Sequence, residues 1–145
     1  MKSPGSDKAS KLKASFKRSA CPIACVLDIL GDKWALLVVR DLLLRDKHLY
    51  SEILQSGEKI PTNILADRLR RLAAAGIITK EPYQQNPVRY AYRLTSAGIA
   101  LGPILKEIIH WGNQHISYAG VPPAEWLQRL TGSSNKFRDK STNPK

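Results

Sequence analysis

The chain has 145 residues, of which 43% are hydrophobic and 24% charged, and its formal net charge is +11. This length and composition fit one globular domain with tails. No apolar run reaches the ~20 residues that a bilayer-spanning helix needs, and the charged N-terminus lacks the apolar stretch of a secretory signal, so a cytoplasmic protein without membrane contact is expected.

The positive charge is concentrated at the two ends. Residues 1–20 contain six Lys or Arg and one Asp, and residues 131–145 contain four Lys or Arg and one Asp. Both tails are rich in Ser, Lys, Asn and Gly, which predicts a basic disordered arm over 1–19 and, within 119–145, a short helix followed by a basic tail. The domain itself is placed at 20–118. The charged tails favour either added solubility or additional phosphate contacts, which strengthen DNA binding without reading sequence.

Two helices are predicted at the start of the domain. Pro22 suits the first turn of a helix that ends at Gly31, and Asp32 is placed to cap a second helix from Lys33 to about Leu44. In the first helix four apolar residues share one face: Ile23, Val26, Leu27 and Leu30. The second helix is apolar nearly all round, so it is expected at the centre of the core.

A third, short helix is expected from Ser51 to Gln55. Leu49 and Tyr50, just before it, form a candidate short strand that would pair with a later hairpin.

An amphipathic helix follows over residues 60–72. Leu65, Leu69 and Leu72 are spaced i, i+4, i+7, so they form one stripe that must face the core. The opposite face carries Thr62, Asn63, Ala66, Asp67, Arg70 and Arg71. Small and polar residues near a helix N-terminus, with Arg one or two turns later, are able to enter the major groove of DNA. The alternative is a plain solvated helix face.

Two strands are predicted directly after this helix, over 77–83 and 89–95, around a polar tip at 84–87. Tyr90, Tyr92 and Leu94 alternate with Arg89, Ala91 and Arg93, so we expect the first set to pack inward and the second to face outward.

A basic helix followed at once by a hairpin is typical of a winged helix-turn-helix. The predicted fold is therefore mainly α with a small β-hairpin wing, and the predicted partner is double-stranded DNA. The candidate DNA-binding residues are Thr62, Asn63, Ala66, Asp67, Arg70 and Arg71 in the helix and Gln85, Asn86 and Arg89 in the wing.

A long helix is predicted over 97–116, capped by Thr95 and Ser96. It carries more apolar surface than a small winged domain needs: Leu101, Ile104, Leu105, Ile108, Ile109, Trp111 and Ile116. This surface either packs on the protein's own core or, together with the first helix, forms a dimer interface. The dimer is favoured, because DNA-binding proteins of this size usually need two half-sites. A last short helix is expected over 123–130, anchored by Trp126 and Leu127.

Several short motifs together resemble one family. They are Cys21-Pro22 with Leu27, Gly31-Asp-Lys-Trp34, Ser51-Glu-Ile53, Asn63-Ile-Leu65 with Arg68-Leu69 and Leu72, Ala75-Gly-Ile77, Tyr90-Ala-Tyr92-Arg-Leu-Thr95 with Gly98, and Trp111-Gly112. In order and spacing they resemble the HxlR-type winged helix-turn-helix transcriptional regulators, relatives of the MarR type, over about residues 20–116.

The resemblance implies a homodimer that binds an inverted repeat in a promoter. It also implies a sensor role for the Cys-Pro cysteine, here Cys21, because some relatives use that position to detect quinones, aldehydes or oxidants. The chain departs from the pattern twice: Leu49-Tyr50 replaces an aromatic residue before the Ser-Glu pair, and Pro61 stands where a Ser often caps the recognition helix.

Cys21 also has a physical argument of its own. It precedes Pro22 at a helix N-terminus, with Lys17 and Arg18 nearby, and both the helix dipole and positive charge favour the reactive thiolate. Cys25 lies one turn later. Two cysteines do not make a disulfide scaffold, and the alternative to a sensor is a pair of small buried apolar side chains.

Enzymatic and metal sites are not expected. The sequence has no Gly-rich phosphate loop, nucleophile elbow or HExxH motif, and His48, His110 and His115 lack metal-ligand spacing, so no catalytic residue, metal or cofactor is predicted. The sequence therefore predicts a sequence-specific regulator, with a repressor as the favoured form and a redox or small aromatic effector as a further hypothesis. The alternatives are a non-specific or architectural nucleic-acid-binding protein and a winged domain that binds only protein.

Overall fold

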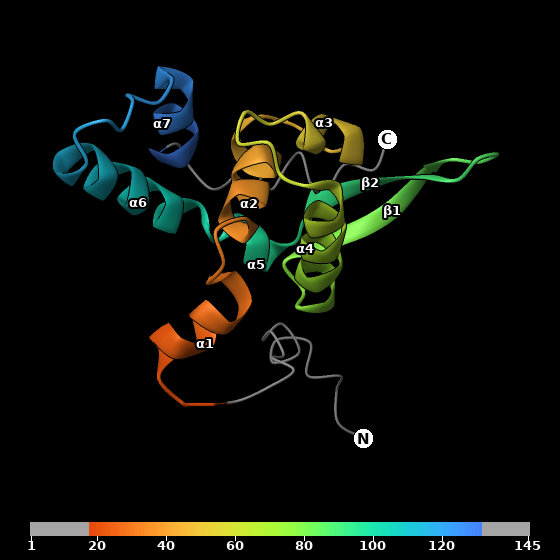
Figure 1. The fold of residues 1–145 in the computed structure, drawn as a ribbon, viewed down its shortest axis with the longest axis horizontal. Coiled ribbons are helices and arrows are strands. Elements are labelled where there is room, and N and C mark those ends of the chain that lie inside the picture. The colour runs from red at the N-terminus through yellow and green to blue at the C-terminus, as the bar shows by residue number, and fades with distance from the viewer. Residues whose placement is uncertain (1–17, 132–145) are drawn as a thin grey trace.

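The computed structural model describes residues 18–131, in which helices surround a central helix and one hairpin projects from the side (Figure 1). The elements are α1 (Pro22–Leu30), α2 (Ala35–Leu44), α3 (Tyr50–Leu54), α4 (Thr62–Ala74), β1 (Ile78–Gln84), β2 (Arg89–Leu94), α5 (Ser96–Ile99), α6 (Gly102–His115) and α7 (Ala124–Thr131). In this range no helix combines the length and the apolar character needed to cross a bilayer. Apart from Arg18 and Ser19, the predicted basic arm lies outside the described residues, as does the basic tail after residue 131.

The junction between α1 and α2 is built by two residues. At Gly31 an added Cβ would lie 2.3 Å from the Leu27 carbonyl oxygen, so only glycine fits this close approach. The Asp32 carboxylate then accepts the backbone N–H groups of Trp34 and Ala35 at 2.7 and 2.9 Å. Asp32 thus binds the first N–H groups at the start of α2, but the predicted cap position is wrong: the cap position is Trp34, and the helix begins at Ala35 instead of Lys33.

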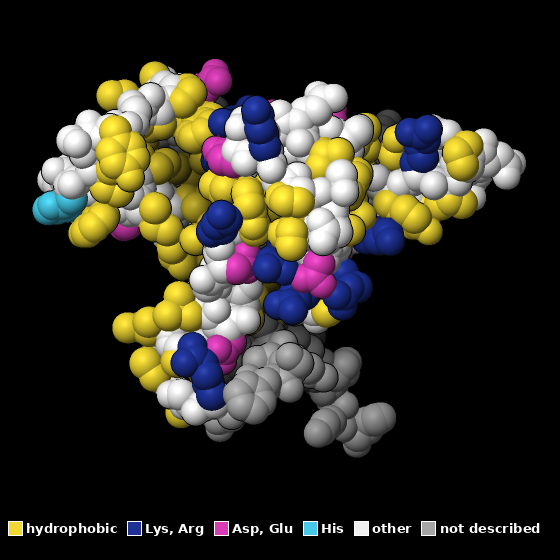
Figure 2. Space-filling view, in the orientation of Figure 1, with side chains coloured by type: hydrophobic (Ala, Val, Ile, Leu, Met, Phe, Trp, Pro, Cys, Tyr) yellow, Lys and Arg dark blue, Asp and Glu magenta, His cyan; other side chains and the backbone are white. Residues whose placement is uncertain are grey.

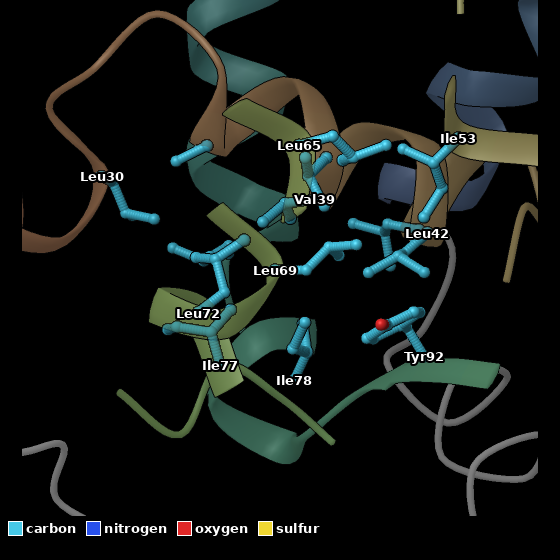
Figure 3. Close-up of a cluster of buried hydrophobic side chains, with 14 of the residues drawn as sticks. Leu30, Val39, Leu42, Ile53, Leu65, Leu69, Leu72, Ile77, Ile78 and Tyr92 are labelled. Atoms are coloured by element: carbon cyan, nitrogen blue, oxygen red, sulfur yellow. The ribbon is translucent and has the colours of Figure 1, made fainter. Parts of the chain in front are cut away.

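The core is centred on α2, as its apolar sequence predicted. Val38 and Val39 are fully buried, and the stripe of leucines on α4 lies on the same side as Val39 (Figure 3). That stripe is confirmed: Leu65, Leu69 and Leu72 all lie in the core cluster. Burial of each leucine contributes about 1.5–3 kcal/mol, so this face fixes which side of α4 is left for solvent.

The hairpin forms as predicted, with β1 and β2 antiparallel and Ile78 opposite Leu94. The predicted inward and outward sets are only partly correct. Tyr92 is buried, but Ala91, expected to face outward, is buried as well, because Leu49 forms a β-bridge to it. Tyr90, expected to pack inward, is exposed, because it lies in the outer part of the hairpin, where both strands are exposed.

The segment before α3 is a bridge, not a full strand. The Tyr92 N–H donates to the His48 carbonyl at 2.8 Å, so the predicted pairing with the hairpin exists. Tyr50, however, already starts α3. The Glu52 carboxylate accepts the N–H groups of His48 and Leu49 at 2.9 and 3.0 Å, and this local cap favours the helix over a longer strand.

The predicted long helix over 97–116 is wrong in its continuity. It is divided into α5 and α6, with a break at Ala100 and Leu101. Pro103 explains the break, because its ring lacks an N–H and would clash with the Ile99 carbonyl in a continuous helix. The predicted last helix is confirmed as α7, whose Arg129 donates to the carbonyls of Leu43 and Leu44 at the end of α2.

Candidate nucleic-acid interface

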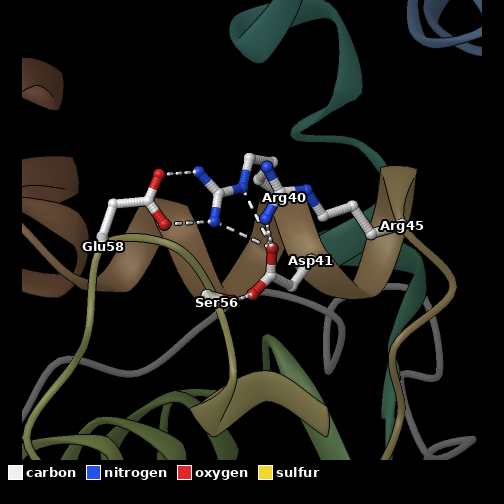
Figure 4. A network of polar contacts seen from close by, with 5 residues as sticks. All are labelled: Arg40, Asp41, Arg45, Ser56 and Glu58. Carbon is white, nitrogen blue, oxygen red and sulfur yellow. Dashed lines mark hydrogen bonds and ion pairs between the residues drawn. The ribbon is translucent and has the colours of Figure 1, made fainter. Parts of the chain in front are cut away.

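The turn between α3 and α4 is held against α2 by a polar network (Figure 4). Asp41 of α2 is fully buried and forms ion pairs with Arg40 at 2.9 Å and Arg45 at 3.4 Å. Its other carboxylate oxygen accepts the hydroxyl of Ser56 in the turn. Arg40 in turn donates to both carboxylate oxygens of Glu58, at 2.7 and 2.9 Å. Because Ser56 and Glu58 both precede α4, the network sets the angle at which α4 leaves the turn.

Glu58 makes this arrangement sensitive to acid. Hydrogen bonds from the Arg40 guanidinium lower the pKa of Glu58 from its ordinary value of 4.5 to about 2. The stability that this ion pair contributes is present above pH 4.5, and it is lost as the pH falls toward 2. Near neutral pH the turn is therefore held in place.

The outward face of α4 has the composition expected of a helix that enters a groove. Thr62, Asn63 and Ala66 are exposed along its first half, and the side chains of Arg70 and Arg71 in its second half are 72% and 66% exposed. α4 begins at Thr62, and Pro61 occupies the cap position in place of the Ser that is often found there. Because proline has no side-chain acceptor, the first N–H groups of the helix have no side-chain cap.

Asp67, the remaining candidate on α4, differs from the others. It is half-buried and forms ion pairs with Arg68, Arg70 and Arg71. The acidic and basic side chains gathered over α4 are visible below the hairpin in Figure 2. The sequence position of Asp67 was compatible with a base contact. Its ion pairs could not be predicted from the sequence, because they depend on the side-chain rotamers that the fold selects.

The wing carries a second exposed set. Gln85 and Asn86 lie in its tip and Arg89 opens β2, all three exposed. On the strands, the Lys80 ammonium lies 4.3 Å from the centre of the Tyr90 ring. Lys80 was not among the sequence candidates. Its place beside Tyr90 follows from the strand register, in which Lys80 pairs with Tyr92 and Pro82 with Tyr90 on the same face.

The helix and the wing are joined directly. Gly76 has a φ of 88°, and the Ile77 N–H donates to the Leu72 carbonyl at 2.9 Å, which ends α4 and starts β1 within a few residues. The two exposed sets are therefore separated by only a short turn that is hydrogen-bonded to the end of α4.

Cys21 lies at the N-terminal cap of α1 and is exposed, whereas Cys25 is half-buried and its thiol donates to the Ser19 carbonyl at 3.3 Å. Both thiols are free. The interpretation of two buried apolar cysteines is wrong for Cys21. Arg18, expected to favour the thiolate, is engaged with Asp28 at 2.6 Å, and Lys17 lies outside the described residues.

Comparison with known proteins agrees with this geometry. Residues 29–119 match the family described as HxlR-like helix-turn-helix. An HTH-type transcriptional regulator of Mycobacterium tuberculosis is 31% identical over 106 residues, which are 73% of this chain and 66%, just under two thirds, of that regulator. The crystal structure of the transcription factor PA1607 is 35% identical with a TM-score of 0.62, covering 74% of this chain and 71% of that one. The reduced form of the redox regulator HypR is 31% identical with a TM-score of 0.57, covering 64% and 91%.

Proposed function

Because the chain belongs to the HxlR-like helix-turn-helix family of transcriptional regulators, we propose that it is a repressor that binds an inverted repeat in promoter DNA as a homodimer. The observation that carries the proposal is the outward face of α4. It presents Thr62, Asn63 and Arg70 on the side opposite the buried leucine stripe, beside a wing that presents Arg89. Side chains of these types pair with base edges and phosphates.

The dimer is supported by two helical faces that the protomer leaves exposed, which we term the apolar dimer faces. They consist of Ile23, Val26 and Leu27 on α1 and Ile104, Ile108 and Trp111 on α6. An open depression of about 500 Å³ lies along α6, lined by residues that include Ile108 and Trp111. A second copy related by two-fold symmetry would cover both faces at once and supply the second recognition helix that an inverted repeat requires.

The recognition contacts can be tested by two alanine substitutions. Arg70→Ala should weaken binding to the preferred inverted repeat, selected from a randomised duplex library, by about 1–3 kcal/mol. It should also relax the sequence preference of the protein, because a base contact is lost. Arg89→Ala should weaken binding to all duplexes more evenly, because a wing arginine neutralises phosphate or lies in the minor groove. Fluorescence anisotropy with a duplex enriched from a randomised library, and with its shuffled version, measures both effects.

Unchanged affinity of Arg70→Ala for the enriched duplex would show that α4 does not read the bases. Equal binding of wild type to enriched and shuffled duplexes would instead favour a non-specific or architectural binder driven by the basic tails. If Arg70→Ala and Arg89→Ala both kept the normal function of the protein, the alternative of a winged domain that binds only protein would be favoured.

We also propose that Cys21 senses thiol-reactive compounds such as quinones. The support is its exposure at the N-terminus of α1, two residues before Ile23 of an apolar dimer face, together with the similarity to HypR, which is a redox regulator. A quinone that adds to the Cys21 sulfur would place a bulky group at the dimer helices, and a shift of a few ångströms there changes the distance between two recognition helices.

The sensor role predicts a specific pattern of release from DNA. After treatment with benzoquinone, wild type and Cys25→Ser should lose most of their affinity for the enriched duplex, whereas Cys21→Ser should retain it. Electrophoretic mobility shifts before and after treatment measure this, with mass spectrometry to identify the modified residue. Retention of full affinity by treated wild type, or its loss in Cys21→Ser, would remove Cys21 as the switch and leave the DNA-binding proposal intact.

A further inference from the structure

One acidic side chain stands among the three arginines of α4, where a groove-binding helix would meet the most negative surface. Asp67 pairs with Arg68 and Arg71 through one carboxylate oxygen and with Arg70 through the other. The Arg71 contact, from Nε, measures 3.1 Å. Both oxygens are therefore occupied by guanidinium groups of the same helix, which leaves Asp67 poorly suited to accept a hydrogen bond from a base.

Arg68 fixes this carboxylate to the rest of the fold. Its side chain is only 17% exposed, and its Nε lies 3.0 Å from the Asp32 carboxylate, which also accepts the N–H group of Ala35 at the start of α2. Burial raises the pKa of Asp32, but the backbone N–H groups of Trp34 and Ala35 and the adjacent Arg68 guanidinium outweigh it, so the pKa lies below its ordinary value and Asp32 stays charged near neutral pH. Asp67 is thus linked through Arg68 to the start of α2, and it is not a free surface charge.

Ordinary helix-surface pairing explains only part of this arrangement. Pairs spaced i, i+3 and i, i+4 stabilise a helix slightly and account for Arg70 and Arg71. They do not account for the half-buried link through Arg68 to another helix. A carboxylate in this position also repels phosphates, so it lowers affinity for every DNA sequence. That loss is useful to a DNA-binding protein only if the carboxylate improves discrimination between sequences.

The ion pairs leave donors free on both exposed arginines. Arg71 contacts Asp67 through Nε, so its two terminal nitrogens remain available as a fork. Arg70 uses one terminal nitrogen, Nη2, and keeps its other donors. Each arginine is therefore oriented by Asp67 and still able to contact a guanine edge or a phosphate, which reduces the conformational entropy lost when it binds in that one orientation.

We propose that Asp67 is a positioning residue for Arg70 and Arg71 that contacts no base, and that it sets sequence specificity by restraining both arginines in the free protein. On random DNA, contacts between phosphates and these two arginines are too weak to replace the ion pairs with Asp67. On the specific site, the arginines contact the DNA in the orientation that the ion pairs already hold, so the pairs are not broken. Asp67 consequently lowers non-specific affinity more than specific affinity. This inference rests on the proposed function, because it requires that α4 reads DNA.

The test compares Asp67→Asn with Asp67→Glu, and uses Glu125→Gln as a control that removes one exposed acidic charge on α7, away from α4. Dissociation constants are measured on full-length protein between 50 and 300 mM KCl, with the enriched duplex and with its shuffled version. For Asp67→Asn the shuffled duplex should bind about tenfold more tightly at the lowest salt, and the salt slope should steepen by about 0.9 for each additional phosphate that the released arginines neutralise. The ratio of specific to non-specific affinity should fall about tenfold.

Asp67→Glu, which keeps the carboxylate, should restore most of the ratio, and Glu125→Gln should leave it unchanged. Arg68→Gln provides a second variant that does not alter the carboxylate, and it should also lower the ratio because Asp67 loses its link to Asp32. If Asp67→Asn changes both duplexes equally, as the control does, the inference is wrong while the proposed function stands. If wild type itself shows no preference for the enriched duplex, the proposed function fails and this inference fails with it.

Discussion

Replacing Ile108 with glutamate is expected to convert the proposed dimer to monomers and to lower affinity for the inverted repeat by at least about 100-fold. Ile108 is exposed on α6 in the protomer, so a charged side chain there costs the isolated fold little. Across a two-fold interface the same change buries an unpaired carboxylate twice, which is strongly unfavourable. Each monomer then binds one half-site only.

Sedimentation velocity at micromolar concentration measures the first effect and anisotropy the second. Ile23→Glu on α1 should act in the same way, because Ile23 belongs to the other apolar dimer face. Val121→Glu is the control, since Val121 is also apolar and is even more exposed than Ile108, but lies in the segment between α6 and α7. A wild-type monomer at these concentrations, or a dimer unaffected by Ile108→Glu, would contradict the proposed interface.

Replacing Asp41 with alanine is expected to lower the free energy of unfolding by about 3–5 kcal/mol, because one partner of a buried ionic network is removed. Arg40 would keep Glu58, but the buried Ser56 hydroxyl would lose its acceptor and the Arg40 guanidinium its buried partner. Urea denaturation at one fixed protomer concentration measures the loss as a lower midpoint with an unchanged slope.

Two milder variants grade the effect. Ser56→Ala should cost about 1 kcal/mol, because it removes one hydrogen bond while Asp41 keeps its two arginines. Arg45→Ala should cost less than about 1 kcal/mol, because Arg45 is partly exposed and its ion pair is long, at 3.4 Å. An Asp41→Ala protein within about 0.5 kcal/mol of wild type would show that the network does not stabilise the turn.

Elements with a regular hydrophobic spacing, and helix ends marked by Pro, Gly or Asp, could be predicted from the sequence. The leucine stripe of α4, the two strands of the hairpin, Pro22, Gly31 and Asp32 all act within a few residues of their position, so local rules located them. Local rules were insufficient where the burial of a residue depends on a segment far away in the sequence. Ala91 is buried because Leu49, more than forty residues earlier, bridges to it. The break before α6 was itself a local signal, Pro103, that the apolar spacing of 97–116 obscured.

The candidate site divides in the same way. The exposure of Asn63 and Arg70 followed from their register against the buried leucines of α4. Arg89 is exposed as predicted, but its neighbour Tyr90 is exposed as well, so strand alternation does not explain it. The separate character of Asp67 did not, because its anchoring depends on Arg68 reaching Asp32 at the start of another helix. The buried role of Asp41 was similarly hidden within an apolar helix, since its partner Ser56 lies in a turn whose position depends on the whole fold.

Sequence-specific binding by a homodimer is tested most directly by selection from a randomised duplex library with the full-length protein, in the presence of excess random competitor DNA. We expect enrichment of one inverted repeat with half-site centres about 34 Å apart, or one further helical turn, and protection of both half-sites in footprinting. We also expect this preference to survive at about 200 mM salt, where phosphate contacts alone are much weakened. Absence of any enriched sequence, or enrichment of a single half-site only, would contradict it.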